Sequence, residues 1–237
     1  MPAYNTVQFI KQAINSMLGQ TYANWELIVV DDCSVDGSWE IATQLAKSNP
    51  RIRVYKNTEN MGISHTRQRA VELSCGDIIG HLDSDDILER WAIEEMVAVL
   101  NAFPDVDLAY SDYSQIGVKN ELQYYNLGKP FDANKLSQHG WRHFGAYRRS
   151  AFDRVGGFNK HLRRHCEDGD LFMKIAETSK CLWVPKVLYF YRNHGKNSTG
   201  AKPKCEDCTL RSKCDFVRVW SKSANYDPLT FTPLKAA

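Results

Sequence analysis

The sequence predicts an α/β fold, a wound, mixed and mainly parallel β-sheet flanked by helices. Short apolar runs alternate with segments whose apolar residues recur at helical spacing, and the connections between them are short. Two of these runs also end in acidic groups, Asp31-Asp32 and Asp83-Ser84-Asp85-Asp86. Because ligands bind at the carboxyl ends of the strands in an open α/β sheet, we expect both groups to face one site.

Composition narrows the class of protein. The 237 residues suffice for one large domain, and 43% hydrophobic with 24% charged residues is ordinary for a globular chain. A net charge of +2 without long Lys/Arg runs argues against nucleic acid as a partner. We expect no transmembrane segment and no signal peptide, hence a cytoplasmic location, either free or peripherally at the inner face of the membrane. Seven cysteines, an odd number, predict reduced thiols.

The first half of the chain supplies the alternation. Residues 1–5 have the composition of a strand exit, and residues 26–32 form an apolar run typical of a strand buried on both faces. Further strands are expected at residues 52–55, 78–82 and 107–111. Helices are expected over residues 7–18, from 36, from 60 to 74, and over 87–101.

The second half is less regular. Residues 117–140 lack periodicity and predict long loops or a hairpin over the ligand edge of the sheet. Order returns at residues 144–158, followed by an expected helix over 167–178 and a strand over 182–191. The last residues are polar and rich in lysine, and we expect no core of their own there.

Asp83, Asp85 and Asp86 put three carboxylates within four residues at a strand end. They repel one another unless a cation lies among them, and Mg²⁺ commonly takes one or two protein carboxylates together with substrate phosphates. In the other interpretation, Asp83, Ser84 and Asp86 cap the next helix and complement its dipole. Capping accounts for one or two of these acids rather than for all three.

Eight short motifs follow one another along residues 1–200. They are Pro2-Ala3-Tyr4-Asn5, Gln20-Thr21-Tyr22, the segment from Trp25 to Ser38, Asn60-Met61-Gly62 with Arg67, Leu82 to Asp86, Val155-Gly156-Gly157-Phe158, Glu167-Asp168, and Tyr191-Arg192-Asn193-His194. In this order and spacing they resemble the family 2 glycosyltransferases, which have the GT-A fold. The resemblance implies one domain over residues 1–200, with a nucleotide-binding half (1–115) and an acceptor and catalytic half (116–200). Residues 201–237 form a Cys- and Lys-rich extension.

The resemblance also implies an activity. It is the inverting transfer of a sugar from a nucleotide-diphosphate donor, most often a UDP-sugar, to an acceptor hydroxyl on a glycan, lipid or polymer, with Mn²⁺ or Mg²⁺ bound. The implied donor-binding residues are Pro2, Tyr4, Asp32, Arg67, Asp83, Ser84 and Asp85, and the implied metal residues are Asp85, Asp83 and His194. Asp168 is the implied catalytic base, with Glu167 and Asp170 as alternatives.

The chemistry of the donor residues agrees with these roles, although each has a plainer interpretation. Tyr4 can stack on a nucleobase, or pack at a strand end. Asp32 can accept a pyrimidine N–H, whereas Asp31 is expected to accept from backbone donors of its own loop. Arg67 can reach the base or the phosphates with its fork, or be a solvated surface residue.

The C-terminal residues also have two interpretations. Glu167 and Asp168 stand at a helix start, where acids are favourable for the helix dipole alone. His194 can ligate the metal or donate to a phosphate oxygen, and Arg192 can serve the same phosphates, but a lone histidine is more often structural.

Two departures from the family stand out. The apolar residues that usually precede the Pro2-Ala3-Tyr4-Asn5 motif and form the central first strand are absent, so two neighbouring strands are expected to lack a partner unless another segment takes the position. Cys205, Cys208 and Cys214 supply three of the four ligands of a structural zinc site, with His194 or Cys181 as a fourth. Incidental reduced thiols are the alternative.

Two other functions fit parts of the pattern. A nucleotidyltransferase also gathers carboxylates and Mg²⁺ around a nucleotide, but it needs a glycine-rich, basic phosphate loop near the N-terminus, which the sequence lacks. An inactive nucleotide-sugar binding module is the third possibility, and the presence of both Asp85 and Asp168 argues against it.

Overall fold

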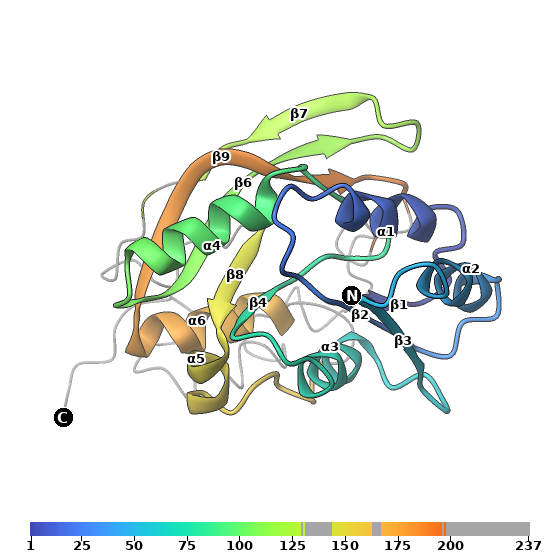
Figure 1. Cartoon of the computed structure of the whole chain (residues 1–237), viewed down its shortest axis with the longest axis horizontal. Helices are drawn as coiled ribbons and strands as arrows, with labels where there is room; N and C mark the ends of the chain where they lie inside the picture. Colours follow the sequence, from blue (N-terminus) through green and yellow to red (C-terminus); the bar gives the residue numbers. More distant parts are fainter. Residues whose placement is uncertain (129, 131–143, 163–166, 196, 198–237) are drawn as a thin grey trace, which may run out of the picture.

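Strands and helices alternate as the sequence predicts in the computed structural model, which describes residues 1–128, 130, 144–162, 167–195 and 197 (Figure 1). The N-terminal elements are β1 (Pro2–Ala3), α1 (Ile10–Leu18), β2 (Leu27–Asp31), α2 (Ser38–Ala46), β3 (Ile52–Lys56), α3 (Ile63–Glu72), β4 (Ile78–Gly80), β5 (Ile87–Leu88) and α4 (Ala92–Ala102). They are followed by β6 (Val106–Ile116), β7 (Leu122–Asn126), β8 (Gly145–Arg148), α5 (Arg149–Arg154), α6 (Glu167–Thr178) and β9 (Lys180–Arg192). No helix in these ranges is both long and apolar enough to span a membrane.

The strands form two sheets. The first has the order β1-β2-β3 and is parallel throughout. The second has the order β4-β8-β6-β9-β5, with β7 paired to β6, and only the β6–β9 pair is parallel. The expected mixed α/β architecture is therefore confirmed, while parallel pairing dominates only the first sheet.

Two predicted elements differ most from the structure. The helix expected over residues 87–101 begins only at Ala92, because Ile87 and Leu88 instead pair as a short strand with Phe190 and Tyr189 of β9. The strand expected over 107–111 is longer, since β6 continues to Ile116 and turns back into β7. This hairpin is one of the two forms expected after residue 117.

Helices cover both faces of the sheets, with α1, α2 and α4 on one face and α3, α5 and α6 on the other (Figure 1). The alternation of side chains along β2 explains this arrangement. Leu27 and Val29 pack with α1, α2 and α4 in one cluster, whereas Ile28 and Val30 pack with Ala70 of α3. Such a strand, buried on both faces, needs the continuous apolar run that the sequence shows.

The first strand, β1, is short. β1 comprises two residues, which pair with Val30 and Asp31. A cavity of about 740 Å³ separates the two sheets beyond it, lined by Met1, by Leu27 and Ile28 of β2, by β4, and by side chains of α1, α3 and α4. Among the described residues, no strand pairs with the edge of β4 that faces away from β8. The expectation of two incompletely partnered strands is confirmed.

Candidate active site

The acidic loop after β4 does not cap a helix. The next helix, α4, begins at Ala92, and no side chain caps its N-terminus. The capping interpretation of Asp83, Ser84 and Asp86 is therefore wrong. Instead, the three carboxylates of the loop have three different sets of partners.

Asp83 binds Arg67, and Arg67 links it to α6. The Arg67 side chain is buried on α3, with Nη2 donating to Asp83 Oδ1 at 2.7 Å and Nε lying 2.9 Å from Glu167 Oε1. Burial alone would lower the pKa of Arg67, but the carboxylates of Asp83, Glu167 and Asp168 raise it. The fork of Arg67 thus lies between two carboxylates of the chain itself, and a contact of Arg67 with a base or phosphate stays a prediction.

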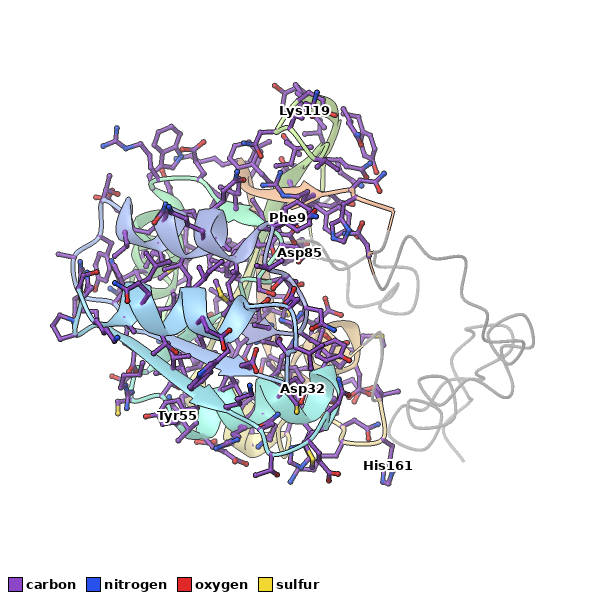
Figure 2. The ribbon with its side chains drawn as sticks, turned by 90° about the vertical axis from the view of Figure 1, so that its right-hand side faces the viewer. Phe9, Asp32, Tyr55, Asp85, Lys119 and His161 are labelled. Carbon is purple, nitrogen blue, oxygen red and sulfur yellow. The ribbon has the colours of Figure 1, made fainter. Side chains whose placement is uncertain are left out.

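Asp85 binds His194 near the end of β9. Asp85 Oδ2 and His194 Nε2 are 2.9 Å apart, and the His194 ring stacks on Phe9 at a centroid distance of 4.8 Å. Phe9 and Asp85 lie on the same side of the molecule (Figure 2). The backbone N–H of His194 donates to Asn197 Oδ1 at 2.9 Å, which fixes the segment that carries the ring.

The donor atoms of this pair suit a divalent metal ion. Carboxylate oxygen suits Mg²⁺ and Mn²⁺, and imidazole nitrogen suits transition metals such as Mn²⁺. Within the described ranges, no group of three or more His, Cys, Asp or Glu side chains is arranged to hold a metal ion. Asp83, the third expected ligand, turns to Arg67. The pair fits an ion that takes its remaining ligands from phosphates and water better than a closed protein-only site.

Asp86 points into the protein. Its Oδ1 accepts from the backbone N–H of Arg192 and its Oδ2 from the Tyr189 hydroxyl, both at 2.7 Å. Burial, followed by the nearby Asp85 and Asp83 carboxylates, raises the pKa of Asp86. The Tyr189 hydroxyl also accepts from the Asp83 backbone N–H at 3.2 Å. The last acid of the loop thus attaches it to β9.

Three acids stand in the first turn of α6. Glu167 is buried against Arg67, and burial raises its pKa to about 7 despite the guanidinium. Asp170 is fully buried, with Lys174 Nζ 3.2 Å from its Oδ2. Asp168 is half-buried and is the most accessible of the three, and its Oδ1 accepts from the Gly169 N–H at 2.7 Å.

The acids after β2 are held by the loops around them. Asp31 Oδ2 accepts from the Ser34 N–H at 3.0 Å, which confirms the expected backbone partner within its own loop. Asp32 is buried and accepts from Asn57 Nδ2 at 2.7 Å and from the N–H groups of Met61 and Gly62 at 2.8 and 2.9 Å. Asp32, labelled in Figure 2, therefore joins the end of β2 to the loop that opens α3.

The remaining expected donor residues lie around β1. Pro2 is part of β1, and Tyr4 follows it with half of its surface exposed. Ser84 is buried in the acidic loop, where its hydroxyl accepts from Thr6 Oγ1 at 3.0 Å. This bond connects the acidic loop to the segment after β1.

Two further expectations concern the C-terminal part. Arg192 does not face an open phosphate site, because its guanidinium donates to acceptors of the chain. The zinc hypothesis for Cys205, Cys208 and Cys214 lies outside the described residues. Of its proposed fourth ligands, His194 is paired with Asp85 and Cys181 is partly buried in β9.

Sequence reasoning missed several residues of this site. Tyr189, Phe9, Asn57 and Gln12 carry no local signal, because each acquires its role through partners at least nine residues away. Asn57 is the nearest to a visible signal, since it directly follows β3.

Known proteins resemble the chain in sequence and in fold. The model of the family described as glycosyl transferase family 2 matches residues 1–156. Hyaluronan synthase of Pasteurella multocida is 29% identical over 233 residues, which is 98% of this chain and 23% of that protein. The chain thus spans about a quarter of that relative.

Two solved structures share the fold. S. aureus TarS 1-349 in complex with UDP-GlcNAc matches with a TM-score of 0.74 and 20% identity, over 94% of this chain and 64% of that chain. The mannosyltransferase PcManGT from Pyrobaculum calidifontis, in complex with GDP-Man and Mn²⁺, matches with a TM-score of 0.68 and 20% identity, over 97% and 65%. The fold is therefore the GT-A fold of nucleotide-sugar transferases.

Proposed function

Because the chain belongs to glycosyl transferase family 2, we propose that its site moves a sugar from a nucleotide-diphosphate donor to an acceptor hydroxyl with inversion at the anomeric carbon. One observation carries the proposal furthest. The Arg67 guanidinium contacts both Asp83 and Glu167, and so brings the acidic loop of the N-terminal half beside the start of α6. A donor-binding loop and a general base have to be this close for transfer between bound substrates.

In this proposal one half of the chain binds the donor and the other half binds the acceptor. Residues 1–115 hold the donor. Tyr4 stacks against its nucleobase, Asp32 lies near the pyrimidine ring, and Asp83 and Ser84 lie at the ribose. Residues 116–200 supply the acceptor side. The exposure of Tyr4 and the position of Asp32 at a parallel strand end support the donor assignment.

Asp168 acts as the base. It accepts the proton of the acceptor hydroxyl while that oxygen bonds to the anomeric carbon, and the bond from this carbon to the diphosphate breaks with its electron pair going to the diphosphate. Attack on the face opposite the leaving group inverts the carbon. Glu167 and Asp170 are weaker candidates, because Arg67 and Lys174 bind them in buried sites.

Asp85 and His194 would hold a divalent ion, Mn²⁺ rather than Mg²⁺, which when bound neutralises the charge that develops on the diphosphate. The imidazole ligand favours Mn²⁺ over Mg²⁺, whose ligands are almost all oxygens. Asp83 takes part through the outer shell, since Arg67 engages its carboxylate.

A UDP-sugar as donor and a growing glycan as acceptor are the substrates we favour. The chain shares its fold with TarS, whose structure was solved in complex with UDP-GlcNAc. A segment of a hyaluronan synthase is similar to the chain in sequence. GDP-sugars are the competing donors, since the mannosyltransferase with the same fold binds GDP-Man.

The test measures thermal unfolding with UDP, GDP and their sugars, with and without Mn²⁺. A UDP-sugar with Mn²⁺ should raise the melting temperature by several degrees, since a ligand at a hundred times its Kd stabilises by about 2.7 kcal/mol. Asp85→Ala should remove the Mn²⁺-dependent part. Asp105→Ala, which alters an exposed acid directly before β6, should leave it intact and is the matched control. An unchanged Mn²⁺ effect in Asp85→Ala would refute the metal assignment, and binding without transfer to any glycan would indicate an inactive binding module.

A further inference from the structure

Arg192 is the most heavily bonded cation described near the acidic loop. Its side chain is fully buried at the end of β9. Nη1 donates to the carbonyl oxygens of Gly117 and Val118 at 3.1 and 3.2 Å and to Asn120 Oδ1 at 2.5 Å, while Nη2 donates to Gln12 Oε1 at 2.8 Å. The guanidinium therefore joins the β6–β7 turn to α1.

The same side chain holds the backbone of the proposed metal ligand. Arg192 Nε donates to the Asp85 carbonyl oxygen at 2.8 Å, and the Arg192 backbone N–H donates to Asp86 Oδ1 at 2.7 Å. Two successive residues of the acidic loop are thus attached to one residue of β9. Rotation of the Asp85 backbone would break the first of these bonds.

The second proposed ligand is attached to Arg192 as well. His194 follows it by two residues, and Asn197 closes this segment by donating to the Arg192 carbonyl oxygen at 2.6 Å and accepting from the His194 N–H at 2.9 Å. Phe9 lies against both, with its ring 5.1 Å from the Arg192 guanidinium carbon and stacked on His194. Arg192 is the residue shared by the supports of Asp85 and His194.

We propose that Arg192 is a positioning residue, which sets the distance and orientation of Asp85 and His194 and binds no phosphate itself. The inference rests on the proposed function of this pair as a metal site. Partners of metal ligands typically change metal affinity 10- to 100-fold when they are removed. Lysine keeps the charge but lacks the planar fork, so it cannot reach Asp85, Asn120 and Gln12 together.

The variant Arg192→Lys tests the inference by binding measurements, without a nucleotide sugar and without measuring turnover. Binding of Mn²⁺ is measured at saturating UDP, because the pair takes its remaining ligands from phosphates and water, and is followed by the electron paramagnetic resonance signal of the free ion against a blank of UDP without protein. Binding of UDP alone is measured by calorimetry in EDTA. We expect Mn²⁺ affinity to fall about tenfold or more, while UDP affinity without metal stays the same. A direct phosphate ligand would show the reverse, namely weaker UDP binding with unchanged Mn²⁺ affinity, and that result overturns the inference.

The experiment must also distinguish a positioning role of Arg192 from a purely structural one. A lower melting temperature with unchanged Mn²⁺ affinity in Arg192→Lys would likewise overturn the inference. If this variant does not fold, Asn120→Ala decides, because it removes one acceptor and leaves Arg192 in place. A threefold or greater loss of Mn²⁺ affinity supports positioning, and no loss overturns it. Gln123→Ala, in the same hairpin and bonded to Gln115 instead, is the control and should match the wild type.

The wild-type protein separates this inference from the proposed function. If it binds no Mn²⁺ at saturating UDP beyond the blank of UDP without protein, the metal site itself is wrong and the positioning role falls with it. If it binds Mn²⁺ through Asp85 and Arg192→Lys binds it equally well, only the positioning role is wrong.

Discussion

Arg67 shows how one buried cation organises several acids. Its guanidinium is almost inaccessible, and it contacts Asp83 and Glu167 from two separate elements. A buried charge is tolerated when it is paired, but removing one partner leaves another charge uncompensated and typically costs 3–5 kcal/mol. Arg67 therefore determines both the stability of this region and the separation of the acidic loop from α6.

Replacement of Asp168 by Asn should abolish transfer and preserve donor binding. The amide cannot accept a proton, and loss of a general base typically lowers the rate by about 10²- to 10⁴-fold. Turnover of a UDP-sugar with a glycan acceptor and the Kd of UDP are the two measurements. Asp153→Asn, an exposed acid of α5, is the matched control. Turnover near the wild-type level in Asp168→Asn would transfer the base role to Glu167.

Replacement of Glu167 by Gln should change how stability depends on pH. The folded-state pKa of Glu167 is about 7 against an ordinary 4.5, so the folded protein holds this proton more tightly than the unfolded chain. Its contribution to stability is therefore complete below pH 4.5 and is lost as pH rises through 7.

The measurement is urea unfolding of both proteins at pH 5 and at pH 8. The stability of the wild type relative to Glu167→Gln should fall with rising pH, by up to about 3 kcal/mol. An equal difference at both pH values would show that Glu167 ionises normally in the folded protein.

At the level of elements, the cavity between the sheets is the main irregularity. β2 pairs with β3 along its whole length but with β1 only at Val30 and Asp31. The Met1 ammonium group donates to the Ile28 carbonyl oxygen at 2.8 Å, and burial lowers its pKa to about 5. A neutral amide would suit this position better than a buried amine, because burial disfavours the charged form.

An apolar segment fused before Met1 should therefore stabilise the protein. Four residues, Ile-Val-Ile-Val, would continue β1 along β2 and bury side chains worth about 1.5–3 kcal/mol each. A melting temperature higher by about 5 °C or more is expected, since 1 kcal/mol shifts a domain of this size by about 2–4 °C. Ile-Asp-Ile-Asp is the control of equal length, which should not stabilise. Equal melting temperatures for the two fusions would show that the cavity does not accept a strand.

At the level of the whole molecule, the site is assembled from parts that are distant in the chain. Asp85 meets His194 109 residues later, and Gln12 meets Arg192 180 residues later. The end of β9 supplies Tyr189 and Arg192, and the segment directly after it supplies His194. This part of the chain reaches the acidic loop because β9 pairs in parallel with β6 across the second sheet. The N-terminal half alone would therefore leave the acidic loop without the partners that orient it.

The fold was predictable because its signals are local. The apolar run of β2 and the helical spacing in α6, whose bounds Glu167–Thr178 agree with the prediction, each depend on residues close in sequence. The start of α4 was not, because Ile87 and Leu88 form a strand only through β9, about a hundred residues away.

The sequence by itself determined the α/β architecture, the strand ends that carry acids, and the family motifs, since periodicity and motif spacing are properties of neighbouring residues. Only the tertiary structure decided the partner of each acid: Arg67 for Asp83, His194 for Asp85, and Tyr189 with Arg192 for Asp86. An aspartate looks the same in the sequence whether its carboxylate binds a metal ion, a guanidinium group or a hydroxyl group. The physical reason for the difference is that the pairing of β9 in the second sheet, and not the sequence around position 85, places these partners.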